Sequence, residues 1–434
     1  MIPESAIKVI RVTYSDPINI EFCQIKVKKQ TIMKKLSLKY VAAMSSVILV
    51  VGYLGSCTKG DQILDIPQTI NNNTDLVSVK VTTPPVIDGT IDAIWSNSPK
   101  LQFSTAVPEV TGDVFRSYTG NVISNVTLRS AYDQTNIYFL LEWLDPTQSL
   151  SRQPWYYDPA TKRWAQEIGA PTFSATGAII RPAFYEDKVG FLWNINNSVA
   201  GWSTATCYKS CHTGLPATDG SSRHFTNSAT EKIDMWHWKS VRGGVNGGFQ
   251  FEDQNQINKY PNGRQGDPGN DVYANNVQSL FITGSAPALA VSVPKYVIPA
   301  KSNYGWILGT EITAGTAKLV TAVSATGELT LSDGTTIDPN TGTDYQRIGL
   351  GLGAKAIPGL TINSYTGSRG DISCKAIYTG SGWILEFTRA LKTADNIYDV
   401  DFSDLADQYF GIGIFENAQI AHSIKPNLIL KFKK

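Results

Sequence analysis

The sequence predicts a mainly β protein built as an antiparallel β-sandwich. Short runs rich in aromatic and branched residues recur along the chain, and Gly, Asn and Asp turns separate them. Helical periodicity is scarce, so packed antiparallel sheets are the architecture expected to bury these runs. The expected strands cover residues 77–81, 136–143, 188–195, 383–388, 409–415 and 427–432.

Two long stretches without a strand pattern interrupt these runs, at residues 196–276 and 312–370. Loops of that length in a compact domain usually carry function or are insertions. We therefore expect the functional residues of the sandwich within the first stretch.

That stretch contains Cys207 and Cys211, and His212 follows at once. Two thiols beside an imidazole form the arrangement that attaches haem c covalently, with thioethers to the haem and the histidine on the iron. The usual motif has two residues between the cysteines, whereas this chain has three. A disulfide or half of a zinc site would use the same cysteines, and both alternatives stay open.

The amino-terminal region predicts export. A positively charged stretch opens at Met33, and the apolar run that follows is too short and wrongly flanked for a membrane span. It ends at Cys57 in a sequence that resembles the processing box of bacterial lipoproteins, whose cysteine is lipidated. We expect a lipoprotein signal peptide over residues 33–56 and a lipid anchor with its tether over 57–76. Residues 1–32 look like an over-extended start, with a genuine leader as the alternative.

The cysteine count agrees with this organisation. Of the five cysteines, Cys23 precedes the expected start and Cys57 is the expected anchor. Cys374 is then the one cysteine left in addition to the motif pair. A single leftover cysteine cannot support a disulfide framework. Haem is attached covalently to such motifs in exported bacterial proteins, so we expect a location in the cell envelope, at the outer membrane or the periplasmic face.

Charge and motifs exclude several other functions. The net charge of +1 gives no electrostatic reason to expect a nucleic-acid partner. The chain lacks a Gly-x-Ser-x-Gly elbow, a phosphate-binding glycine loop and a zinc-protease helix motif. We therefore expect an electron carrier and not an enzyme, with redox proteins as partners and the membrane reached through the lipid anchor.

A family resemblance adds to these expectations. Residues 85–95 resemble the opening of family 9 carbohydrate-binding modules and their haem-binding relatives. Residues 188–195, the cysteine motif and residues 234–239 follow in the order seen in the ethylbenzene-dehydrogenase-related haem-binding domain. The closing segments, 382–393 and 415–422, are similar to that domain as well.

The resemblance implies one carbohydrate-binding-module-like, or DOMON-like, sandwich over residues 77–434 that carries a single covalent haem c. Residues 289–358 match less well and are expected to form an insertion. In the cytochrome b relatives the second iron ligand follows the penultimate strand, which by position implies His422 as the partner of His212. A surface histidine in a turn is the alternative for His422.

Residues 234–239 offer other candidates. Alternation in an extended segment places Trp236 and Trp238 on one face, with Met235 and His237 on the other. Met235 and His237 are alternative sixth ligands, and the tryptophans are expected to pack on the porphyrin or in the core. Lys239 would pair with a haem propionate or remain in solvent. His224 is expected to be an ordinary loop residue.

Two rival functions remain. A lipid-anchored carbohydrate-binding sandwich without haem would use exposed aromatic residues for stacking, and the chain has ten tryptophans and nineteen tyrosines. In that case the motif cysteines would form a disulfide or a metal site. Alternatively, the chain is the haem subunit of a larger oxidoreductase.

Overall fold

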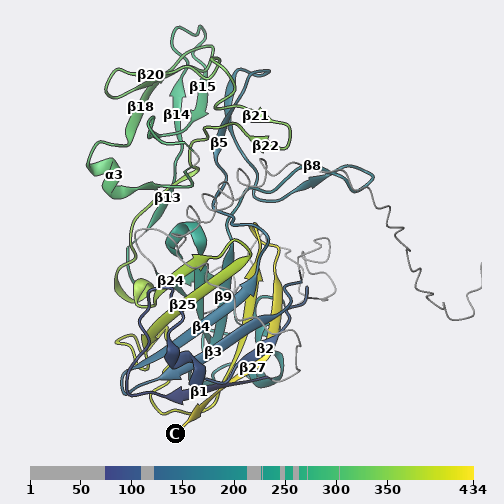
Figure 1. Cartoon of the computed structure of the whole chain (residues 1–434). Helices are drawn as coiled ribbons and strands as arrows, with labels where there is room; N and C mark the ends of the chain where they lie inside the picture. Colours follow the sequence, from purple (N-terminus) through teal and green to yellow (C-terminus); the bar gives the residue numbers. More distant parts are fainter. Residues whose placement is uncertain are drawn as a thin grey trace, which may run out of the picture. The chain divides into compact units, whose positions relative to one another are not determined.

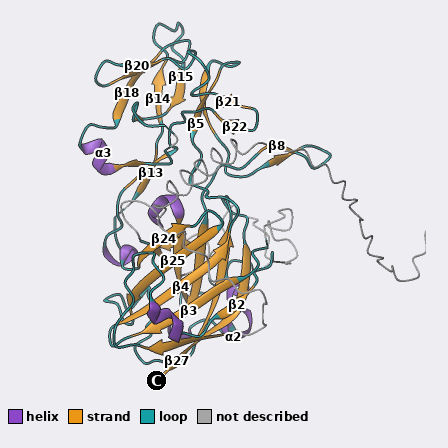
Figure 2. Cartoon of the chain, in the orientation of Figure 1, coloured by secondary structure: helices purple, strands orange, loops and turns teal. Residues whose placement is uncertain are grey.

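The computed structural model describes residues 74–108, 122–212, 226, 228–244, 250–257, 263–270, 272–302 and 304–434. The expected signal peptide, Cys57, all of the tether up to residue 73, and His224 lie outside these residues. Strands dominate the described part of the chain, and its helices are short (Figure 2). None of these helices is long and apolar enough to cross a membrane. The predicted mainly β fold is confirmed.

Twelve of the described strands form one large sheet. In order across the sheet they are β12 (Arg264–Gly266), β11 (Glu252–Ile257), β10 (Lys232–Lys239), β9 (Lys188–Asn194), β26 (Gln408–Phe415), β27 (Ser423–Lys433), β1 (Asp75–Lys80), β3 (Val126–Tyr132), β4 (Asn136–Leu144), β25 (Gly382–Ala390) and β24 (Ser373–Tyr378), with β2 (Leu101–Phe103) on β3. The pairing is antiparallel except at β1, which runs parallel to β27 and to β3.

The sheet curls so that its two halves pack face to face. In one layer β24, β25, β4 and β3 follow one another (Figure 1), and Phe139 of β4 stacks on Phe387 of β25 at 4.8 Å between ring centres. From the other half, Trp236 of β10 and Trp193 of β9 approach Phe139 to 5.8 and 6.3 Å. These rings are fully buried, so the sandwich core lies between the two halves.

Hydrogen bonds also join the two ends of the large sheet. Gln250, just before β11, forms an antiparallel bridge with Ser373 of β24. The backbone N–H of Phe251 donates to the carbonyl oxygen of Ile372 at 3.0 Å. This contact covers backbone groups that would otherwise be exposed at the sheet edges.

The expectation of irregular structure over residues 196–276 and 312–370 is wrong in part. The first stretch supplies β10, β11 and β12. The second contains β18 to β23, which belong to smaller sheets and whose bounds are given below. In β11 the sequence is Glu-Asp-Gln-Asn-Gln-Ile, and all but the last of these residues are buried. Residues of this type are depleted in strands, so hydrophobic alternation could not reveal this one.

Smaller sheets surround a second hydrophobic cluster, the accessory core, which contains Trp155, Tyr157, Trp164, Ile282 and Ile357 among others. The accessory core contains residues that precede the expected insertion as well as residues within it. These strands are β5 (Trp155–Asp158), β6 (Arg163–Gln166), β7 (Thr172–Phe173), β8 (Ile179–Arg181), β13 (Tyr273–Asn275), β14 (Gln278–Phe281), β15 (Ala290–Val293), β16 (Tyr296–Val297), β17 (Ile307–Leu308), β18 (Lys318–Val323), β19 (Leu329–Leu331), β20 (Thr336–Ile337), β21 (Arg347–Ile348), β22 (Gly351–Leu352) and β23 (Leu360–Ile362).

Short helices lie between the strands. They are η1 (Ala93–Asn97), η3 (Ile195–Asn197), α2 (Trp202–Ala205), η4 (Thr206–Lys209), η5 (Ser240–Gly244), α3 (Gly309–Thr313) and η6 (Gly367–Gly370). Of these, α2 and η4 follow one another directly and carry the cysteine motif.

Candidate functional site

The cysteine motif is held against the outer face of the large sheet, which is the face opposite the sandwich core. Trp202 Nε1 donates to the carbonyl oxygen of Tyr409 at 2.8 Å, so α2 is fixed to β26. The backbone N–H groups of Cys211 and His212 both donate to the carbonyl oxygen of Cys207 at 3.1 Å. The two thiols and the imidazole therefore project from one closed turn.

Neither cysteine of the motif is in a disulfide, and both are buried. Cys207 is 3% exposed and Cys211 is 7% exposed, and both pack with Leu192 and Met235 in a small apolar cluster. Burial raises the pKa of Cys207 to about 12, so the thiol is neutral. The motif thus presents two buried, reduced cysteines in the same turn as His212.

The structure brings His212 together with His422, although 210 positions separate them in the sequence. Their Nε2 atoms lie 3.1 Å apart, and both residues are buried. His422 Nδ1 donates to the carbonyl oxygen of Ile420 at 2.7 Å, which leaves the Nε2 lone pair directed at His212. Phe415 stacks on the His422 ring at 4.2 Å between centres and fixes its plane.

This donor set fits haem iron. A transition metal binds imidazole nitrogen at about 2 Å, so two nitrogens on opposite sides of an iron lie about 4 Å apart. The observed 3.1 Å would need to widen by about 1 Å. Imidazole ligands with two thiols beside them suit an iron porphyrin held by thioethers, whereas a hard cation would need oxygen ligands.

Three glycines leave the outer face of the sheet bare at this place. Gly411 and Gly413 lie on β26, and Gly413 pairs with Gly190 of β9. A Cβ at Gly411 would collide with the sulfur of Cys207, and one at Gly413 would lie 3.1 Å from the His422 ring. At Gly190 the nearest atom is the methyl group of Met235, at 3.7 Å. Glycine inside a strand often marks the close approach of another group. These glycines could therefore have indicated the site from the sequence.

Met235 lies beside the thiols. The Gln256 side chain amide donates to Met235 Sδ at 3.4 Å and lies 3.7 Å from Cys211 Sγ. A thioether in this position is near enough to the motif to remain an alternative ligand, as the sequence analysis proposed.

His237 lies on the same face but contacts Phe415, at 5.9 Å between ring centres. Its Nδ1 donates to Gln254 Oε1 at 3.1 Å, and its buried Nε2 has no hydrogen-bond partner among the described residues. Burial, and then the charges of Lys239 and Lys188, lower the pKa of His237 well below its usual value. The neutral ring therefore keeps a lone pair on Nε2, but the structure does not direct it at His212.

The predicted alternation of residues 235–238 is confirmed. Trp236 and Trp238 belong to the sandwich core, whereas Met235 belongs to the cluster around the thiols. The expectation that the tryptophans line the haem pocket is therefore corrected. They pack in the core, where Trp238 contacts Trp143 at 5.8 Å between ring centres.

Lys239 is 3% exposed, so the expectation that its side chain remains in solvent is wrong. It forms a buried ion pair with Glu252, and burial lowers the pKa of Lys239 to about 7. Lys188 lies nearby on β9, where its Nζ donates to the carbonyl oxygen of Gln419 at 2.9 Å and sits 4.1 Å from the centre of the Phe415 ring. Two buried lysines thus lie on the same face of the sheet as the two histidines, and burial lowers the pKa of Lys188 as well.

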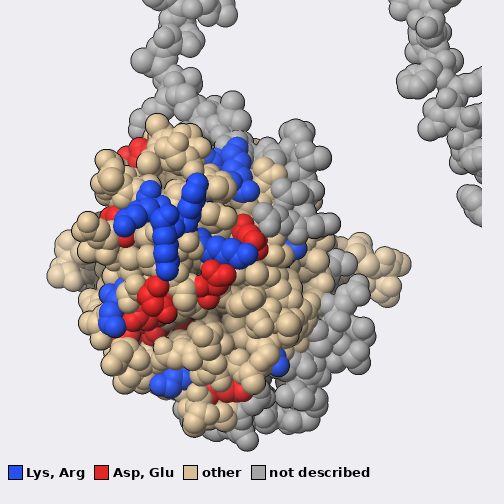
Figure 3. Space-filling model, turned by 90° about the horizontal axis from the view of Figure 1, so that it is seen from below, with Lys and Arg blue, Asp and Glu red and all other residues tan. Residues whose placement is uncertain are grey.

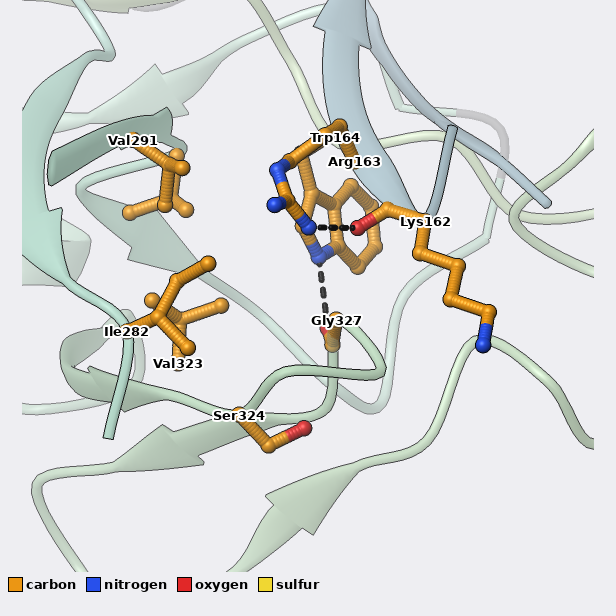
Figure 4. A pocket seen from close by; sticks show the side chains of 9 residues that line it. Lys162, Arg163, Trp164, Ile282, Val291, Val323, Ser324 and Gly327 are labelled. Carbon is orange, nitrogen blue, oxygen red and sulfur yellow. Dashed lines mark hydrogen bonds between the residues drawn. The ribbon is translucent and has the colours of Figure 1, made fainter. Parts of the chain in front are cut away.

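The other surfaces offer less chemistry. A shallow hollow in the accessory core is lined by Trp164, Ile282, Val291 and Val323 among others (Figure 4). Trp164 Nε1 donates to the carbonyl oxygen of Gly327 at 2.7 Å beside it, and the hollow has no room for a small-molecule ligand. On the face seen in Figure 3, bands of basic and acidic side chains lie next to each other, without a large area of one sign.

Comparisons with known proteins agree with part of these findings. A family model described as ethylbenzene dehydrogenase matches residues 92–426, which contain every described residue of the candidate site. No curated protein matches the chain.

Among solved structures, a family 9 carbohydrate-binding module from Caldicellulosiruptor kristjanssonii is similar, in complexes with glucose and with cellotriose. Both matches have 10% sequence identity and a TM-score of 0.26, and both cover 83% of this chain. They cover 95% and 93% of the module, respectively.

Proposed function

The chain belongs to the ethylbenzene dehydrogenase family, and from this we propose that it is an exported electron carrier that holds one covalent haem c. The observation that carries the proposal is the meeting of two buried Nε2 atoms, from His212 and His422, at the turn that carries Cys207 and Cys211. A haem held there supplies reversible one-electron exchange.

Each residue of the site has a distinct role in this proposal. Cys207 and Cys211 would anchor the cofactor through thioethers, and His212 and His422 would supply the imidazole ligands of the iron. The backbone of Ile420 and the ring of Phe415 orient His422, so its position is set before any cofactor arrives. Gly411 and Gly413 let the Cys207 sulfur and the His422 ring lie directly against the sheet.

The surroundings suit electron transfer. His422 is fixed to the end of β27, and the cysteine turn is fixed to β26 through Trp202, so both ligands rest on the same rigid sheet. The site is apolar around the thiols and excludes water there. A rigid, dry site changes little when an electron arrives or leaves.

The binding-module alternative needs exposed aromatic rings for sugar stacking. All ten tryptophans lie in the described part of the chain; nine are buried and Trp306 is half-buried. The tryptophans therefore do not form a stacking surface, whereas Phe173 and Phe281 are exposed. Membership of a larger oxidoreductase remains a second candidate, since the family match fits a subunit as well as a free carrier.

The direct test is the absorption spectrum of the protein made together with haem-attachment machinery. We expect a red protein whose haem stays on the polypeptide after denaturation and extraction with acidified organic solvent. Colour that extracts freely contradicts the thioethers, and a colourless protein from the same cells supports the binding-module alternative.

We also propose that lipidation of Cys57 anchors the protein to the membrane, where it exchanges electrons with redox partner proteins in the cell envelope. Replacing Cys57 by alanine should move the protein from the membrane fraction to the soluble fraction, because acyl chains contribute about 0.8 kcal/mol of membrane affinity per buried CH₂. Fractionation followed by washing in high salt measures this. A Cys57→Ala variant that stays with the membrane contradicts the lipid anchor.

A further inference from the structure

A second cluster of polar groups lies inside the sandwich, on the opposite face of β10 from the two histidines. Five aspartates meet there from separate segments of the chain. Asp234 lies on β10 and Asp253 on β11, and one carboxylate oxygen from each, with one from Asp399, falls within 4.8 Å of the others. These three residues are 0%, 0% and 4% exposed. Asp267 and Asp371 complete the group.

The protein satisfies one oxygen of most of these carboxylates and leaves another open. Asp234 Oδ2 accepts from Arg389 at 3.0 Å and from the backbone N–H of Val400 at 2.9 Å, and Asp253 Oδ1 accepts from the backbone N–H of Gln254 at 2.9 Å. Five buried oxygens have no hydrogen-bond partner among the described residues: Asp234 Oδ1, Asp253 Oδ2, Asp267 Oδ2, Asp371 Oδ1 and Asp399 Oδ1. An ionised carboxylate can only accept, so these oxygens need a proton or a cation.

The aspartates of the cluster crowd together in the interior. Arg389 is 2% exposed and pairs with Asp234 at 3.0 Å. Its guanidinium also lies over the Trp236 ring, 4.8 Å from the centre, so it is held at one side of the group. Burial raises the pKa of Asp234 to about 7, and burial with repulsion from Asp234 raises the pKa of Asp253 well above its usual value. The buried group therefore needs protons or a further cation to be neutralised.

We propose that this aspartate cluster binds one calcium ion. The ligands are all oxygens, which hard cations prefer and zinc or copper do not. Calcium binds oxygen at 2.3–2.6 Å, so ligands on opposite sides of the ion lie roughly 4.6–5.2 Å apart, and the oxygens of Asp234, Asp253 and Asp399 fit within that span. Magnesium binds at about 2.0–2.1 Å and keeps several waters, for which this dry group is less suited.

The site goes beyond the proposed electron transfer and is structural. Of the three aspartates whose oxygens lie within 4.8 Å of one another, Asp234 and Asp253 come from β10 and β11, and Asp399 comes from the segment between β25 and β26. An ion shared by them would tie these two strands to that segment. It lies on the face of β10 that carries Trp236, so its test does not depend on haem.

The experiment uses the full chain after exhaustive dialysis into chelator-treated buffer. Elemental analysis should find about one calcium per chain. Thermal unfolding should shift upward by roughly 5 °C when calcium chloride replaces a chelator, as expected for a ligand that binds the folded state. If the chain contains no calcium and melts at the same temperature in both buffers, the proposal is overturned. The carboxyl groups of the cluster would then be neutralised by shared protons. An equal shift with magnesium chloride overturns the choice of calcium.

Asp253→Asn tests the assignment to this cluster. The variant should lose both the bound calcium and the calcium-dependent shift in melting temperature. Asp344→Asn is the matched control, because Asp344 is exposed and pairs with Lys355 at the surface, and it should keep both. If Asp253→Asn does not fold, the calcium content of the unaltered chain and its reversible response to chelator still decide. Calcium retained by a folded Asp253→Asn variant contradicts the site.

Discussion

Replacing Cys207 and Cys211 together by alanine is expected to lower covalently held haem from about one per chain to none. The two sulfurs are the thiols that lie beside His212, and thioethers to both are what keeps haem on a denatured chain. Haem staining of a denaturing gel, with the mass of the polypeptide, measures the change. Some haem should still bind without a covalent link, because His212 and His422 remain.

Cys374→Ala is the matched control for this double variant. Cys374 is also a free, buried thiol, but it lies in the sandwich core opposite Phe387 of the neighbouring strand. It should keep its covalent haem while losing some stability through the small cavity. Haem that survives denaturation on the Cys207→Ala/Cys211→Ala variant would contradict the proposed attachment.

How much of the fold could be predicted depended on local hydrophobic pattern. Strands such as β4 and β25 alternate or are uniformly apolar, and both strands were predicted from the sequence. β11 could not be found this way, because its Asp253 is buried by a tertiary arrangement and not by a hydrophobic face. The parallel pairing of β1 with β27 and β3 joins distant segments and leaves no local trace.

The site divides in the same way. Cys207, Cys211 and His212 are neighbours in sequence, so the motif alone proposed them. His422 was implied by a family resemblance, and its approach to His212 depends on how β26 and β27 turn beneath the motif. The aspartate cluster was missed because residues such as Asp234 and Asp399 are far apart in sequence and share no spacing.

His422→Ala is expected to convert a low-spin haem into a high-spin one that binds carbon monoxide when reduced. Removing the imidazole takes away the Nε2 atom that lies 3.1 Å from His212 Nε2 and opens one side of the iron. Absorption spectra of the oxidised and reduced protein, with and without carbon monoxide, measure the change. The unaltered protein should have a lower reduction potential than a histidine–methionine haem, since a thioether ligand raises the potential.

His237→Ala is the matched control, because it removes a second buried imidazole from the same face of the sheet. His237 contacts Gln254 and Phe415, so its loss should leave the haem low-spin. A low-spin His422→Ala variant, combined with a high-spin His237→Ala or Met235→Ala variant, would move the sixth ligand to β10. A haem that is high-spin in the unaltered protein would mean that no strong sixth ligand is present. Ligand binding or catalysis would then explain the open iron better than electron transfer.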